Sequence, residues 1–129
     1  MGYKLKVFYH DTDSGGVVYH SNYLNFLEEA RTEFLAQKGI NIKELIQNGA
    51  FFVVSRQEVD YRAPARFGDS LEITTAVKEI TGVRLNLENK VLKDGRILIA
   101  EAKTTLVYIG GNFRPKPIPS DIRGKIEGI

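Results

Sequence analysis

Hydrophobic side chains recur at helical spacing over one long segment that begins near residue 22. They stand at i, i+3, i+4 and i+7, the spacing of one buried helix face. These residues are Tyr23, Phe26, Leu27, Ala30 and Phe34. Ser21 or Asn22 suits the N-cap of this helix, and Gly39 suits the position after its C-cap. The pattern therefore predicts a helix over residues 22–38.

Most of the remaining chain predicts β-strands. In residues 70–80 apolar and polar side chains alternate, as in a strand with one buried face. The expected strands cover residues 4–9, 51–63, 70–80, 83–92 and 97–109. Asp94-Gly95 is a typical hairpin turn between the last two strands. Short helices are expected over residues 42–49 and from about Ser120.

The order of these elements is one strand, one long helix and then four strands. Such a helix can bury its apolar face inside a curved antiparallel sheet, so we expect an α+β fold with a long central helix wrapped by a five-stranded sheet. No linker interrupts the pattern, and we expect one domain over residues 1–129. Because an open sheet leaves unpaired edges, we also expect a homo-oligomer.

Composition narrows the class of protein. The 129 residues are 43% hydrophobic and 26% charged, which is typical of a soluble globular domain. A net charge of +2 does not favour nucleic-acid binding, and the absence of cysteine excludes disulfides and thiol catalysis. With no signal-peptide pattern and no long apolar run, we expect a cytoplasmic protein without membrane insertion.

Two acids, two histidines and two glycines fall in the segment HDTDSGGVVYHSN, residues 10–22. A calcium loop starting at Asp11 would need Glu where Asn22 stands. A phosphate loop would need Lys followed by Ser or Thr after the second glycine. His10, Asp11, Asp13 and His20 have the right ligand types for a divalent metal, but their spacing does not align the donors. A polar turn is the remaining structural alternative.

The position of this segment favours chemistry, because it leads directly into the predicted helix. The first N–H groups of a helix have no intrahelical acceptor and lie at the positive end of the helix dipole. They can stabilise an oxyanion that forms on a carbonyl, while a carboxylate in the loop activates the nucleophile. This arrangement suits acyl transfer or hydrolysis.

The segment YHDTDSGGVVYHSNYLNFLEEAR, residues 9–31, resembles the signature of hotdog-fold thioesterases of the 4-hydroxybenzoyl-CoA type, in particular the YbgC-like acyl-CoA thioesterases associated with the Tol–Pal system. VDYRAPARFGDSLEI (59–73) and FRPKPIPSDIRGKI (113–126) resemble later parts of the same family. The resemblance implies the hotdog fold, in agreement with the element order. It also implies a homo-oligomer, a dimer or a homotetramer built from hotdog dimers.

By this resemblance the catalytic acid falls on Asp13, acting as base or nucleophile, with His20 as its partner. The N–H that polarises the carbonyl falls at about His20. Glu28 and Asp69 match recurrent acids, for which we favour structural roles. His10 and Asp11 are expected to be scaffolding. Substrate-binding positions are Tyr23, Glu28, Arg56 and Arg84; the wider set of candidate phosphate partners adds Arg62, Arg66 and Lys90.

The expected function is hydrolysis of a short- or medium-chain or aromatic acyl-CoA to free acid and CoA, within lipid metabolism and without cofactor or metal. Acyl carrier protein is a second possible acyl donor. The alternative is a partner protein of acyl-carrier or phospholipid synthesis whose hydrolysis is incidental. A hotdog dehydratase is disfavoured because no His-rich strand motif is present.

Overall fold

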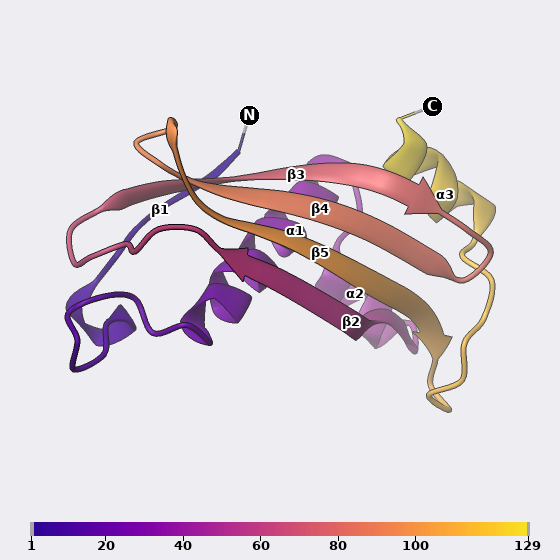
Figure 1. Cartoon of the computed structure of the whole chain (residues 1–129). Helices are drawn as coiled ribbons and strands as arrows, with labels where there is room; N and C mark the ends of the chain where they lie inside the picture. Colours follow the sequence, from indigo (N-terminus) through magenta and orange to yellow (C-terminus); the bar gives the residue numbers. More distant parts are fainter. Residues whose placement is uncertain (1, 129) are drawn as a thin grey trace.

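The computed structural model describes residues 2–128. Its strands are β1 (Tyr3–Lys6), β2 (Ala50–Tyr61), β3 (Ser70–Ile80), β4 (Arg84–Lys93) and β5 (Ile97–Gly110). Its helices are α1 (Asn22–Gln37), α2 (Ile42–Gln47) and α3 (Ser120–Glu127), with a short 3-10 turn η1 (Tyr9–Asp11). Figure 1 shows the five strands as one curved sheet with α1 and α2 behind it. The order of elements matches the order predicted from the sequence.

The sheet has the strand order β1-β3-β4-β5-β2, and every neighbouring pair is antiparallel. The long strand β2 pairs with β5 along its whole length, from Ala50 opposite Gly110 to Tyr61 opposite Ala100. Its other side has no partner strand within residues 2–128, so β2 is an open edge. Val54 and Tyr61 on this strand are 48% and 49% exposed, although both are large apolar side chains.

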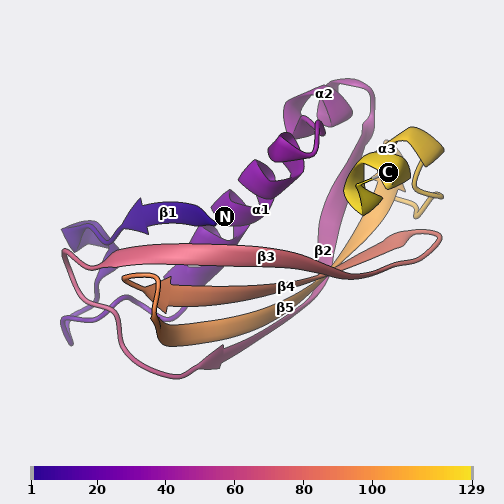
Figure 2. The ribbon, with the colours of Figure 1, turned by 90° about the horizontal axis from the view of Figure 1, so that it is seen from above.

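Helix α1 lies against one face of the sheet, and the opposite face is open (Figures 1 and 2). Its inward side chains enter a core that also contains residues of β3, β4 and β5. The α1 members are Tyr23, Phe26, Leu27 and Ala30, and the sheet members include Leu71, Ile73, Val91 and Ile99. Leu35, near the end of α1, joins a second cluster with Ile122 and Ile126 of α3. Burial of each such side chain contributes about 1.5–3 kcal/mol, which fixes α1 on the sheet.

The first strand is shorter than predicted. We expected a strand over residues 4–9, but β1 ends at Lys6 and a 3-10 turn occupies Tyr9–Asp11. The reason is local: the Phe8 N–H donates to the Asp11 carboxylate at 2.8 Å, and the Asp11 N–H donates to the Phe8 carbonyl at 3.0 Å. These two bonds turn the chain before residues 8 and 9 can join the sheet.

The other predicted elements agree with the structure within a few residues. Gly39 follows α1 with φ +84°, the left-handed conformation expected after a helix C-cap. Ser21 occupies the N-cap position of α1, but its side chain makes no capping hydrogen bond. No helix within residues 2–128 combines the length and the apolar character needed to cross a membrane.

Candidate active site

The loop before α1 presents Asp13 to solvent. The Asp13 N–H donates to the Val17 carbonyl at 2.9 Å, and the Gly16 N–H donates to the Asp13 carbonyl at 3.0 Å. Gly16 has φ +81°, which lets the chain reverse tightly at this point. The Asp13 side chain is exposed, and its Oδ1 accepts the Gly15 N–H at 2.8 Å. The second carboxylate oxygen has no hydrogen-bond donor within residues 2–128, so it is free to act on a bound molecule.

Asp11 has a different environment, because it is only 8% exposed. Its Oδ2 accepts the Phe8 N–H at 2.8 Å, and its Oδ1 accepts the Asn22 side-chain amide at 2.9 Å. The exposed His10 ring lies 3.4 Å from the same Oδ1. Asp11 therefore ties the loop to the first residue of α1, as expected of a scaffolding residue.

The chain turns into α1 at Tyr19, His20 and Ser21. The Asn22 N–H donates to the Tyr19 carbonyl at 2.8 Å, and the Tyr61 hydroxyl donates to the His20 carbonyl at 2.9 Å. Among the described residues, no acceptor faces the N–H of His20 or that of Ser21. The start of α1 thus offers unpaired backbone donors at the place where the carbonyl-polarising N–H was predicted.

A shallow hollow of about 310 Å³ lies beside these donors and has aromatic walls. The His20 and Tyr61 rings are 6.4 Å apart at 89°, and the Tyr23 and Tyr61 rings are 5.5 Å apart at 62°. The Tyr19 ring also packs on His20, with ring centroids 4.7 Å apart. The residues that line the hollow are Val17, Val18, His20, Tyr23, Tyr61, Arg62, Ala63 and Pro64.

Tyr23 is the buried member of this group. Burial raises the pKa of its hydroxyl to about 12, although a hydrogen bond from the Ala65 backbone lowers the pKa in part. The phenol is therefore neutral near pH 7 and acts as a polar but uncharged element of the wall.

The structure brings together some of the predicted site residues and separates others. His20 and Tyr23 line the hollow, whereas Asp13, on the loop before α1, is not among its lining residues. Glu28 is exposed on α1, and Arg84 is exposed at the beginning of β4. Arg56 is paired with Glu58 on β2. Glu28, Arg56 and Arg84 do not line the hollow, and their contacts with substrate stay predictions.

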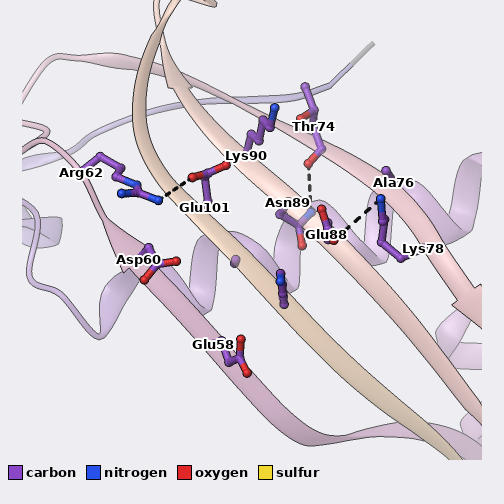
Figure 3. Close-up of a pocket in the computed structure, with 12 residues that line it drawn as sticks. Glu58, Asp60, Arg62, Thr74, Ala76, Lys78, Glu88, Asn89, Lys90 and Glu101 are labelled. Carbon is purple, nitrogen blue, oxygen red and sulfur yellow. Dashed lines mark hydrogen bonds and ion pairs between the residues drawn. The ribbon is translucent and has the colours of Figure 1, made fainter.

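Several candidate phosphate partners lie on the open face of the sheet. Figure 3 shows Arg62 directed at Glu101, and their side chains are 3.0 Å apart. Arg62 and Lys90 both line a second hollow, of about 560 Å³, on that face. Four acids and four bases line it, so positive and negative charges balance: Glu58, Asp60, Glu88 and Glu101 with Arg62, Lys78, Lys90 and Lys103. A balanced surface of this kind does not favour an anion.

Asp69, for which we expected a structural role, lies in the turn before β3. Its Oδ2 accepts the Arg66 N–H at 2.7 Å and lies 3.5 Å from the Lys93 ammonium, which closes the turn before β3. No group of three His, Cys, Asp or Glu side chains in residues 2–128 is placed to hold a metal ion.

Sequence reasoning missed Tyr61 as a member of the site. Tyr61 stands inside VDYRAPARFGDSLEI, one of the segments that carried the family resemblance, but it is 41 residues from His20. Only the pairing of β2 along β5 brings the end of β2 to the start of α1. The sequence signal was its place in that segment, directly before the arginine of YRAPAR.

The chain matches the Thioesterase-like superfamily over residues 7–126. It is 36% identical to the acyl-CoA thioester hydrolase YbgC of Escherichia coli O6:H1 over 119 residues, which cover 92% of this chain and 89% of that protein. It is 31% identical to the chloroplastic acyl-acyl carrier protein thioesterase ATL3 of Arabidopsis thaliana, over 95% of this chain and 65% of that protein. The structure of the gentisyl-coenzyme A thioesterase BH1999 superposes with a TM-score of 0.89 at 31% identity, over 95% of this chain and 99% of that chain.

Proposed function

The chain belongs to the Thioesterase-like superfamily, and from that premise we propose that it hydrolyses a short- or medium-chain or aromatic acyl-CoA to the free acid and CoA. The predictions of a YbgC-like family, a hotdog fold and a thioester hydrolase are confirmed. We propose the substrate class and the catalytic residues as follows.

The observation that supports the proposal is a free carboxylate oxygen on the loop that leads into a helix start with free N–H donors. Asp13 presents one carboxylate oxygen from the loop, and His20 presents an unpaired N–H at the helix start. In the proposed reaction the thioester oxygen accepts that N–H, which stabilises the oxyanion. Asp13 either takes a proton from the attacking water or attacks the carbonyl itself.

The bonds balance in either course. When water attacks, its oxygen forms the C–O bond, the C–S bond breaks, and the proton taken up by Asp13 passes to the departing sulfur. When Asp13 attacks, the C–S bond breaks as a mixed anhydride forms; water then cleaves this anhydride, which releases the acid, restores the carboxylate and supplies the proton for the thiol of CoA. The His20 side chain is exposed beside the hollow and is our candidate to assist the departing thiol. The aromatic wall made by Tyr23 and Tyr61 supports an acyl group that is apolar or aromatic.

We also propose that the working enzyme is a homo-oligomer. The edge of β2 leaves unpaired backbone groups, and Val54 exposes 48% of its surface on this strand. A second copy that pairs along β2 would cover both features and add a wall to the shallow hollow. The assembly is then a dimer or a tetramer of such dimers.

The test is turnover of a panel of acyl thioesters by the wild-type protein. Acetyl-, hexanoyl-, decanoyl- and benzoyl-CoA would be compared with the same acyl groups on acyl carrier protein, and the released thiol would be detected with a chromogenic disulfide. We expect turnover of at least one acyl-CoA well above the uncatalysed rate. A preference for the carrier-protein form would replace CoA by carrier protein as the acyl donor. No hydrolysis of any thioester would reject the proposal and favour the alternative of a non-catalytic partner protein.

A further inference from the structure

Tyr61 makes a hydrogen bond to the backbone at the start of α1. It is the last residue of β2, and its hydroxyl donates to the His20 carbonyl at 2.9 Å across 41 residues of sequence. Its ring packs edge-on against His20 and at 62° against Tyr23. Because the phenol ring is held by these contacts, the hydroxyl is placed with little freedom.

A peptide unit is planar and trans, so its C=O and N–H point in opposite directions. A partner that holds the carbonyl therefore also aims the N–H of the next residue. The Asn22 N–H holds the Tyr19 carbonyl at 2.8 Å, which aims the N–H of His20. The Tyr61 hydroxyl holds the His20 carbonyl, which aims the N–H of Ser21.

Nothing else in the N-terminal turn holds the peptide between His20 and Ser21 in place. Ser21 occupies the N-cap position, but its side chain makes no capping bond, and its backbone is helical with φ −73° and ψ −17°. The N–H groups of both His20 and Ser21 lack an acceptor within residues 2–128. A hydrogen bond to the carbonyl also polarises the amide and strengthens its N–H as a donor.

We propose that Tyr61 is a positioning residue for thioester hydrolysis. Its hydroxyl aims and polarises the peptide between His20 and Ser21, so that Ser21 supplies a second N–H donor to the thioester oxygen beside that of His20. This inference rests on the proposed function, because it assigns the donors that the proposed oxyanion needs. Tyr61 acts through that peptide rather than through a bond of its own to the reacting atoms.

Tyr61→Phe tests the role, since it removes the hydroxyl and keeps the ring that packs on His20 and Tyr23. Loss of one oxyanion donor costs on the order of 10²–10³-fold in kcat, and a donor that is present but poorly aimed should cost less, about 10-fold. We expect kcat to fall by about 10-fold while KM stays within about twofold, the pattern of an interaction made in the transition state. Tyr9→Phe is the matched control: Tyr9 is 77% exposed, and within residues 2–128 its hydroxyl has no partner.

A second readout does not depend on activity. In Tyr61→Phe the backbone amide resonance of Ser21 should shift in a nitrogen–proton correlation spectrum, because its peptide loses the bond at the carbonyl, whereas Tyr9→Phe leaves it in place. Wild-type kcat in Tyr61→Phe would overturn the inference, and so would an unchanged Ser21 resonance. A fall in kcat that is accompanied by a lower melting temperature would also overturn it, because it indicates that Tyr61 acts only through packing. If the wild type hydrolyses no thioester, the proposed function fails and the spectrum still decides whether Tyr61 holds this peptide.

Discussion

Replacement of Asp11 by alanine should destabilise the protein, although Asp11 is not a proposed catalytic group. The change removes the acceptor of the Phe8 N–H at 2.8 Å and of the Asn22 amide at 2.9 Å. Asn22 cannot easily reorient, because its own oxygen accepts the Asn25 amide at 2.8 Å. Each hydrogen bond to a charged group contributes about 1.5–3 kcal/mol, and both bonds here are partly buried. Because both bonds are only partly buried, we take the lower end for each and expect a loss of about 3 kcal/mol in the free energy of unfolding.

Urea denaturation followed by circular dichroism measures this loss. With a slope of about 1–3 kcal/mol per molar urea, a loss of about 3 kcal/mol should lower the midpoint by about 1–3 M. Asp13→Ala is the matched comparison, because Asp13 is exposed in the same loop and its side chain bonds only the Gly15 N–H within residues 2–128. Its midpoint should stay close to that of the wild type. Equal midpoints for Asp11→Ala and the wild type would refute the reasoning that Asp11 ties the loop to α1.

Two further perturbations test the fold around the site. Burial raises the pKa of Tyr23 to about 12, above its ordinary value near 10, so between these pH values the unfolded chain loses a proton that the folded protein keeps. Stability should therefore fall as pH rises from about 10 to 12; absorbance titration near 295 nm should show a late-titrating tyrosine that Tyr23→Phe removes, and a single transition near pH 10 would contradict this. Gly39→Ala should cost about 1 kcal/mol, because alanine at φ +84° is strained even though its Cβ would meet Lys125 only at 3.7 Å; an unchanged urea midpoint would exclude that strain.

The long helix and the longer strands could be predicted because their side chains repeat with the period of the element. The end of β1 could not be predicted in this way. The strand ends at Lys6 because Phe8 and Asp11 bond each other and turn the chain, while the alternation of side chains does not change there. A carboxylate that bonds a backbone N–H three residues earlier overrides the β-propensity of two aromatic residues.

The site residues that are close in sequence could be predicted, and those brought together by long-range packing could not. Asp13, His20 and the helix start lie close together in sequence, so a local segment and its family resemblance were enough to propose them. Tyr61 reaches His20 only because β2 is the edge strand beside β5, and strand order is a property of long-range packing. For a similar reason, the sequence could not distinguish phosphate-binding side chains from other charged surface residues. Arg62, directly after β2, pairs with Glu101 of β5, and neither residue alone signals that pair.

The most direct test of the account is hydrolysis of the best acyl-CoA of the panel by Asp13→Asn. Asparagine keeps the size of the side chain and an oxygen for the Gly15 N–H, but it can neither accept a proton as a base nor attack as a carboxylate. Asp94→Asn serves as the control, because Asp94 lies in the hairpin turn between β4 and β5 and its φ of +54° suits asparagine. We predict that Asp13→Asn loses on the order of 10²-fold or more in kcat with an unchanged urea midpoint, while Asp94→Asn keeps wild-type turnover. Wild-type turnover in Asp13→Asn would contradict the central claim that this carboxylate performs the reaction.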